Sequence, residues 1–272
     1  MELLKTILDF IASAPYYNPY IIAILLIVGT IVGFINTIAG MATAISYGLF
    51  MLMGMPINIA NATTRFGVLA QFSLSSFLYK KGGVLEYKEG VKVGIPVGIG
   101  SLAGAQAAAI MPTHILELSI GILLPIIATV LVFENKIKSI GNLRAKMGIE
   151  NKMSIPKFIA FVCIGFYGGY SHAGVGILII FGSFYMLGVD LLKANGIKQI
   201  AVAIYTPIAL LVFVTHDQIN WPVALIYSIG NITGAYFAAK LNIKYGGNII
   251  KWFVAIIVLT MSIVLICKNL YS

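Results

Sequence analysis

Long apolar runs constrain this chain more than any other feature of its sequence. An α-helix needs about 20 residues to cross the roughly 30 Å hydrocarbon core of a bilayer. Several runs reach or approach that length: Tyr20–Ile38, Val91–Ile110, Ile115–Phe133, Trp221–Ala239 and Ile249–Ile266. The runs are apolar on every side, whereas the strands of a membrane β-barrel alternate apolar and polar residues. They therefore predict an all-α integral membrane protein.

Composition agrees with this class and argues against a nucleic-acid-binding domain. Charged residues make up only 10% of the 272 residues, against about 25% in an average soluble domain. The net charge of +9 comes from basic residues in short loops between apolar runs, which is the pattern of membrane topology. No cluster of His, Cys or Asp has metal-site spacing, and we expect neither a metal nor a cofactor.

The first 18 residues predict a separate amphipathic segment. One face of a helix there would carry Leu3, Leu4, Ile7, Leu8 and Ile11, and the opposite face would be polar. We expect segment 1–18 to lie at the membrane interface. Pro15 and Pro19 then break the chain before the first span.

The two halves of the chain resemble each other. A shift of 134 residues places Ala60-Asn61 on Ala194-Asn195, and a shift of 130 places Gly100 and Gly104 on Gly230 and Gly234. Each half contains five hydrophobic segments, about 20–38, 40–54, 57–79, 90–110 and 114–133, then 156–171, 174–187, 190–213, 221–240 and 249–267. We predict two five-segment repeats, 19–133 and 156–272, joined by a linker at 134–155.

The second segment of each half is too short for a full span. As helices, residues 41–54 and 174–187 would reach only about 21 Å, less than the hydrocarbon thickness. Gly40 and Gly174 mark the breaks, and polar residues lie beside them: Asn36, Thr37, Ser171 and His172. Short, glycine-interrupted segments at matching places in two halves are typical of transporters with discontinuous helices. We expect broken or re-entrant helices at the start of each repeat.

The distribution of basic residues predicts the orientation. If the first two segments of each half return to the same side, 15 of the 18 Lys and Arg residues share one side, and the others are Lys5, Arg65 and Lys268. The positive-inside rule makes that side, with the linker, cytoplasmic. The repeats are then inverted, and both termini lie outside the plasma membrane. A cytoplasmic carboxyl terminus, detected by protease access to a tag, would contradict this topology.

Polar residues inside the spans predict an anion site. Arg65 lies about eight residues into its span, where a charge costs about 2.5–3.5 kcal/mol. Lys198 has a comparable place in the second half, and helices restarting after Gly40 and Gly174 would direct N-termini, which favour anions, at the same region. We expect Arg65 to be the main contact and Lys198 a second, with Asn36, Thr37, Gly40, Asn61, Thr64, Gln71, Ser171, His172, Gly174, Asn195 and Gln199 around them.

Structural roles for these residues stay open. Arg65 could pair with Glu117 or a backbone carbonyl, Lys198 could extend to the cytoplasmic face, and His172 could be a packing residue. Ser171-His172 admits an intramembrane hydrolase, but adjacent residues seldom direct nucleophile and base at one atom. We therefore expect no enzyme and no catalytic residue. An anion channel and a non-transporting scaffold stay open as further functions.

The motif Ala60-Asn61-Ala62-Thr63-Thr64-Arg65, with Gln71, resembles Ala-Asn-Ala-Thr-Asn-Arg…Gln of the sulfite exporter TauE/SafE family. The second half is similar to later family elements in Gly168-Gly169-Tyr170 and Ala194-Asn195-Gly196-Ile197-Lys198. The similarity covers about residues 29–265. Many members have a glycine-rich run and a proline in the first broken segment, where this chain has Gly40-Met41-Ala42-Thr43-Ala44-Ile45-Ser46.

The resemblance implies a secondary transporter that exports small sulfur-containing anions, such as sulfite or organosulfonates, without ATP. The absence of a Gly-x4-Gly-Lys motif agrees with this. The expected mechanism is alternating access, and a proton gradient, a sodium gradient or facilitated flux stay open as driving forces. Expected partners are the small anion, membrane lipid and a coupling proton or sodium ion, without nucleic acid. A homodimer stays open.

Overall fold

The computed structural model describes residues 2–85, 87–132 and 153–245, and all regular structure in these ranges is helical. The helices are α1 (Glu2–Ser13), α2 (Pro19–Ile38), α3 (Thr43–Leu52), α4 (Ile57–Lys81), α5 (Tyr87–Ile110), α6 (Thr113–Val132), α8 (Ile155–Tyr170), α9 (Val175–Leu187), α10 (Leu191–Thr215) and α11 (Trp221–Tyr245). Nine of the ten predicted segments are thus confirmed to within five residues at either end. The predicted segment 249–267 and most of the linker 134–155 lie outside the described residues.

The helices have the lengths and surfaces of a membrane protein. By length and mean hydropathy, α2, α5 and α10 could each cross a bilayer. Large apolar side chains on their outer faces are more than half exposed, including Ile27, Ile99 and Leu211. Such a surface suits lipid rather than water. Helix α4 has 25 residues and is more polar, but its polar side chains are mostly buried inside the bundle. The prediction of an all-α membrane protein is therefore confirmed.

Each half of the chain begins with a helical hairpin. Helix α3 turns back after residues 39–42, so that Phe50 joins Ile21 of α2 in one apolar cluster. Helix α9 likewise turns back along α8, as the contact between Gly182 of α9 and Phe161 of α8 shows. The returning helices have only 10 and 13 residues, or about 15 and 20 Å. Neither is long enough to cross a bilayer, as the sequence predicted.

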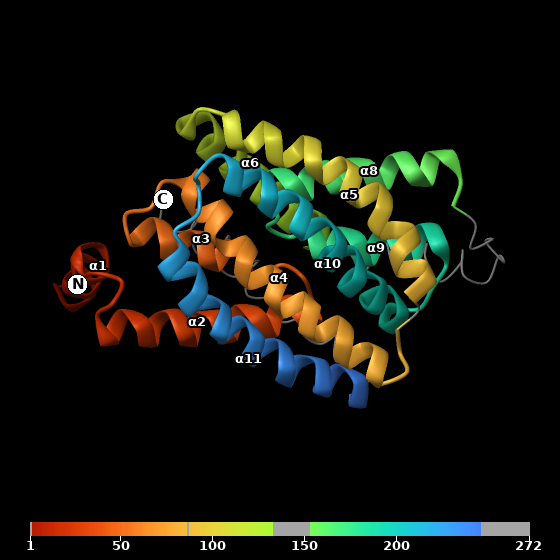
Figure 1. Cartoon of the computed structure of the whole chain (residues 1–272), viewed down its shortest axis with the longest axis horizontal. Coiled ribbons are helices and arrows are strands. Elements are labelled where there is room, and N and C mark those ends of the chain that lie inside the picture. Colours follow the sequence, from red (N-terminus) through yellow and green to blue (C-terminus); the bar gives the residue numbers. More distant parts are fainter. Residues whose placement is uncertain (1, 86, 133–152, 246–272) are drawn as a thin grey trace.

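The two hairpins open at opposite ends of the bundle (Figure 1). Helices α4 and α10 run antiparallel, since Tyr79 at the end of α4 contacts Asn195 at the start of α10. Short connections place the open end of α2–α3 beside the start of α4, and that of α8–α9 beside the start of α10. An inverted repeat requires hairpins that open at opposite ends and an antiparallel pair of α4 and α10. The repeat and its orientation in a membrane stay predictions.

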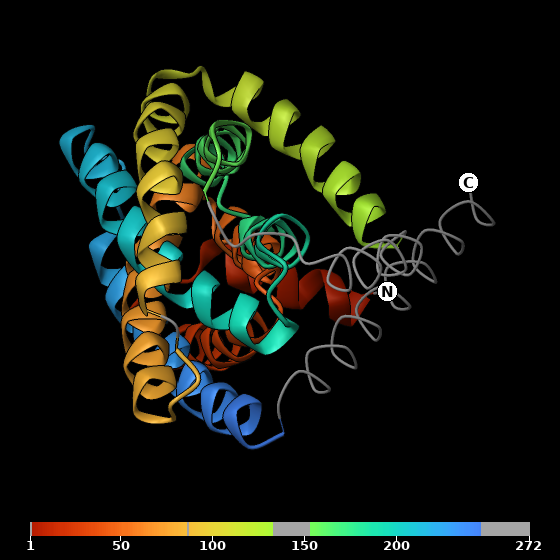
Figure 2. The same cartoon turned by 90° about the vertical axis from the view of Figure 1, so that its right-hand side faces the viewer.

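Glycines bring the hairpins against the long helices. Helix α2 packs along α11, and α8 packs along α5 (Figures 1 and 2). A β-carbon on Gly33 would lie 2.7 Å from Cα of Asn231, and one on Gly165 would lie 2.6 Å from Cα of Val97. Two Gly-x-x-x-Gly patterns lie in these same interfaces and form helix-packing faces: Gly100, Gly104, Gly230 and Gly234.

The tips of the two hairpins touch. Gly40 and Gly174 have φ angles of 77° and 79°, in the left-handed region that favours glycine. A β-carbon on Gly40 would lie 2.7 Å from Cα of Gly176, so the two backbones are in direct contact. The breaks predicted from the sequence therefore meet inside the bundle.

Candidate functional site

Arg65 on α4 binds the end of a helix in the other half of the chain. Its Nη1 donates to the carbonyl of Gly168 at 3.1 Å, and its Nη2 donates to that of Gly169 at 2.5 Å. The last four carbonyls of a helix lack partners within it. The guanidinium is fully buried and lies 4.7 Å from the ring centroid of Phe213. Arg65 therefore caps α8, and the negative end of the helix dipole favours its charge.

Asn61 and Tyr47 bind the same helix end. The Nδ2 of Asn61 donates to the carbonyl of Tyr170 at 2.8 Å, and its Oδ1 accepts from Arg65 at 3.1 Å. The hydroxyl of Tyr47 lies 2.9 Å from this Oδ1 and also contacts the carbonyl of Ser171. We define the arginine cluster as Tyr47, Asn61, Arg65 and the carbonyl groups of residues 168–171.

Lys198 on α10 caps α2 in the corresponding way. Its Nζ donates to the carbonyls of Asn36 and Thr37, both at 2.9 Å, and the side chain is fully buried. Gln199 and Asn195 donate to the same Thr37 carbonyl at 2.9 and 3.3 Å. The interpretation in which Lys198 extends to the cytoplasmic face is therefore wrong, because its ammonium group is used inside the bundle.

Two side chains of α4 complete this second group. The hydroxyl of Ser75 donates to Oε1 of Gln199 at 2.7 Å, and the hydroxyl of Tyr79 accepts from Nδ2 of Asn195 at 2.8 Å. We define the lysine cluster as Ser75, Tyr79, Asn195, Lys198, Gln199 and the carbonyls of Asn36 and Thr37. Arg65 and Lys198 thus belong to two separate hydrogen-bonded clusters rather than to one.

In each cluster, a side chain from one half of the chain caps a helix that belongs to the other half. A residue of α4 binds the end of α8, and a residue of α10 binds the end of α2. At the shift of 134 residues, Gln199 corresponds to Arg65. Its bonds to the Thr37 carbonyl and to Asn195 repeat those that Arg65 makes to a carbonyl and to Asn61. Lys198 adds the positive charge that Gln199 lacks.

No described carboxylate is buried beside either cation. The described acidic side chains are exposed or only partly buried: Asp9, Glu89, Glu117, Asp190 and Asp217. Of the two structural partners expected for Arg65, Glu117 is therefore wrong, whereas the alternative of a backbone carbonyl is the one observed. In the described ranges, no three His, Cys, Asp or Glu side chains are grouped as a metal site.

The remaining predicted residues lie at the breaks or inside α4. The Oδ1 of Asn36 accepts from the backbone of Ala42 at 2.6 Å and so holds the first break. The hydroxyl of Thr64 donates to the Asn61 carbonyl within its own helix. The Nδ1 of His172 lies 2.5 Å from the Tyr205 hydroxyl, so it pairs with α10 rather than with Ser171.

Four of the predicted site residues are fully buried and carry polar atoms without a partner among the described protein atoms. The atoms are the hydroxyls of Thr37 and Ser171, the Nε of Arg65 and both ends of the Gln71 amide. Burying such groups unpaired costs free energy. Within the predicted site, these atoms are available to a polar ligand.

Tyr47, Ser75 and Tyr79 were not predicted as site residues. A signal for two of them is present in the sequence, because Gln71, Ser75 and Tyr79 recur at intervals of four. Residues at this spacing share one face of a helix. Tyr47 has no comparable signal, since its partners come from α4 and from the break after α8.

A family model described as "Sulfite exporter TauE/SafE" matches residues 25–265. The chain belongs to the TauE/SafE sulfite exporter family. It is therefore a membrane transporter and not an enzyme.

Curated relatives of this TauE/SafE protein cover nearly its whole length. The probable membrane transporter protein ORF9 of Sinorhizobium is 25% identical over 249 residues, which are 90% of this chain and 92% of the relative. A probable membrane transporter protein of Haemophilus influenzae is 23% identical over 257 residues, 93% of this chain and 95% of the relative. No solved structure matches significantly.

Lys198→Met should destabilise this transporter, but less than the equivalent change at Arg65. Methionine keeps the apolar stem and removes only the ammonium. The Thr37 carbonyl keeps Gln199 and Asn195 as donors, so only the Asn36 carbonyl loses its partner, at a cost of about 1–3 kcal/mol. Thermal unfolding in detergent measures the loss, with Lys81→Ala as the control. A loss larger than that of Arg65→Met would contradict the capping scheme.

Proposed function

We propose that this protein exports small sulfur-containing oxyanions, such as sulfite or organosulfonates, by alternating access. The observation that carries the proposal is the pair of buried cations, Arg65 and Lys198, without a buried carboxylate in the described part of the chain. A buried charge without a counter-charge is costly, and an oxyanion supplies the missing charge. The family's description as a sulfite exporter supports both the substrate class and the direction.

A bound oxyanion would replace backbone carbonyls as the acceptor for Arg65. The carbonyls of Gly168 and Gly169 carry only partial charges, whereas a sulfite or sulfonate oxygen shares a full charge and forms stronger, charge-assisted hydrogen bonds. Binding at Arg65 would therefore release the end of α8, and binding at Lys198 would release the end of α2. Substrate binding and hairpin movement are coupled in this way.

The contact between the hairpin tips would act as the barrier. Gly40 and Gly176 touch at their backbones, and release of one hairpin at a time would open one end of the bundle while the other stays closed. The helices that restart at the tips have N-caps without a side-chain hydrogen bond, at Ala42 and Gly174. Their free N–H groups would then help to bind the anion. Alternating access around a central site is typical of transporters with inverted repeats and discontinuous helices.

Flux measurements on purified protein in liposomes test the proposal. We expect saturable sulfite or sulfonate uptake that accelerates when unlabelled anion is present on the other side, as exchange by a carrier requires. Repeating the assay with proton or sodium gradients identifies the driving ion. Absence of flux for every sulfur oxyanion tested, in folded protein, would overturn the substrate assignment. Turnover far above carrier rates, without exchange, would favour an anion channel.

A further inference from the structure

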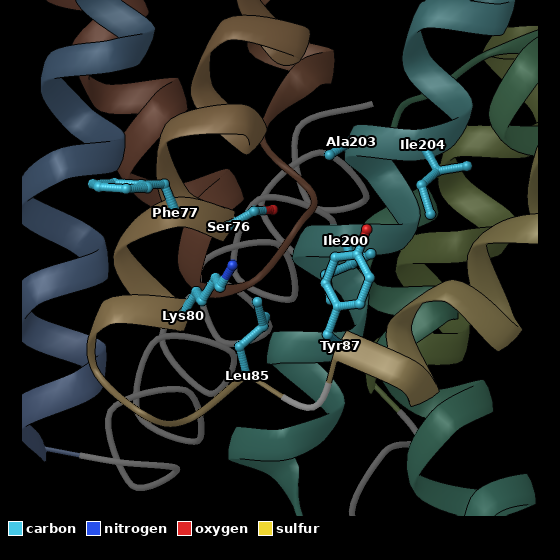
Figure 3. Close-up of a pocket in the computed structure, with 8 residues that line it drawn as sticks. All are labelled: Ser76, Phe77, Lys80, Leu85, Tyr87, Ile200, Ala203 and Ile204. Carbon is cyan, nitrogen blue, oxygen red and sulfur yellow. The ribbon is translucent and has the colours of Figure 1, made fainter.

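A pocket separate from both clusters lies between α4, the start of α5 and α10 (Figure 3). Its volume is about 220 Å³, which is smaller than the roughly 300–1,000 Å³ of ordinary small-molecule sites. Six of its eight lining side chains are apolar or aromatic. The pocket therefore suits part of an elongated, largely apolar ligand rather than a whole compact one.

Two polar groups of α4 reach this pocket. Lys80 is exposed and forms no ion pair with any described residue. The hydroxyl oxygen of Ser76, one turn earlier, is buried and has no hydrogen-bond partner in the same ranges. Figure 3 shows both on α4, across from Ile200, Ala203 and Ile204 on α10. The pocket thus offers a cation and a hydroxyl on one wall and aliphatic side chains on the other.

The surroundings of the pocket are basic and face lipid. Residues 80–92 carry four lysines and two glutamates, at the end of the bundle that the positive-inside rule makes cytoplasmic. Phe77 and Tyr87 line the pocket and are each 62% exposed. An amphiphile in the cytoplasmic leaflet could therefore enter from the side, without leaving the membrane.

We propose that this pocket binds an anionic phospholipid. Its phosphate would lie at Lys80 and Ser76, and part of one acyl chain would lie along Leu85, Ile200 and Ile204. Basic pockets between membrane helices on the cytoplasmic side recognise anionic headgroups, and the apolar wall selects a lipid over a free anion.

The position of the pocket links the lipid to the stability of the bundle. Ser76 and Ile200 directly follow Ser75 and Gln199, whose side chains are joined by a 2.7 Å hydrogen bond between α4 and α10. A lipid in the pocket would contact both helices beside that bond. It should therefore hold the two helices together and raise the unfolding temperature.

Native mass spectrometry and thermal unfolding of the full protein test this proposal. We expect dioleoyl phosphatidylglycerol to be retained and to stabilise the protein, and dioleoyl phosphatidylcholine to do neither. Lys80→Ala should reduce retention of phosphatidylglycerol about tenfold or more, the effect of losing one hydrogen bond to a charged phosphate. Lys81→Ala is the matched control, because Lys81 is adjacent and exposed but does not line the pocket.

A second variant tests the apolar wall. Ala203→Leu should fill the pocket and abolish the preference for phosphatidylglycerol although every lysine remains. Equal losses in Lys80→Ala and Lys81→Ala would overturn the proposal, because binding would then depend on general charge. Unchanged retention in Ala203→Leu would overturn it as well. Equal stabilisation by inorganic phosphate alone would exclude a lipid as the ligand.

Discussion

Arg65→Met is expected to abolish anion transport and to destabilise the protein more than any other single change in the two clusters. The carbonyls of Gly168 and Gly169 would lose the donors that the structure gives them, at about 1–3 kcal/mol each. The anion would also lose its ion pair with Arg65. Losing one partner of a buried ion pair costs about 2–5 kcal/mol of binding free energy, roughly a 30-fold or greater loss of affinity. Thermal unfolding and proteoliposome flux measure the two effects.

Arg65→Lys separates the structural role of Arg65 from its role in binding. Lysine keeps the charge, but one ammonium cannot reproduce the fork that reaches Gly168, Gly169 and Asn61 together. We expect intermediate stability and measurable but reduced flux. Lys81→Ala, at the exposed end of the same helix, should match the unmodified protein. Folded Arg65→Met protein that transports at the normal rate would remove Arg65 from the anion site.

Leucine at Gly33 or at Gly165 is expected to prevent normal folding. A β-carbon on Gly33 would lie 2.7 Å from Cα of Asn231, and one on Gly165 would lie 2.6 Å from Cα of Val97. The obstructing atoms belong to the backbone, so the helices must separate. The cost in stability should reach or exceed about 3 kcal/mol, the upper end of the range typical of overpacking. The yield of monodisperse protein and its unfolding temperature should both fall.

Gly48→Leu is the matched control for this prediction. Gly48 is also helical, but no atom of the described residues lies within 4 Å of a β-carbon placed on it. Replacing it should be neutral or slightly stabilising, since glycine inside a helix costs about 1 kcal/mol relative to better helix formers. If Gly33→Leu, Gly165→Leu and Gly48→Leu behaved alike, close glycine packing would not be what holds α2 on α11 and α8 on α5.

The sequence predicted the segments because the bilayer fixes how long an apolar helix must be. Boundaries of α2, α4 and α5 agree with the apolar runs to within three residues. Both breaks were also predictable, since Gly40 and Gly174 are glycines beside polar residues in segments too short to span. Arg65 and Lys198 were found for the related reason that the membrane makes a buried charge costly enough to need a role.

Only the tertiary structure decided which groups these cations bind. Arg65 reaches a carbonyl 103 positions along the chain, and Lys198 reaches one 162 positions away. The acceptors are backbone atoms, which every residue has, so no side-chain pattern marks them in the sequence. The contact between Gly40 and Gly176 and the opposite directions of the two hairpins depend likewise on packing between distant segments. A sequence shows which polar residues need a partner, because an unpaired polar group is costly inside a membrane. Which group becomes that partner depends on how the helices pack in three dimensions.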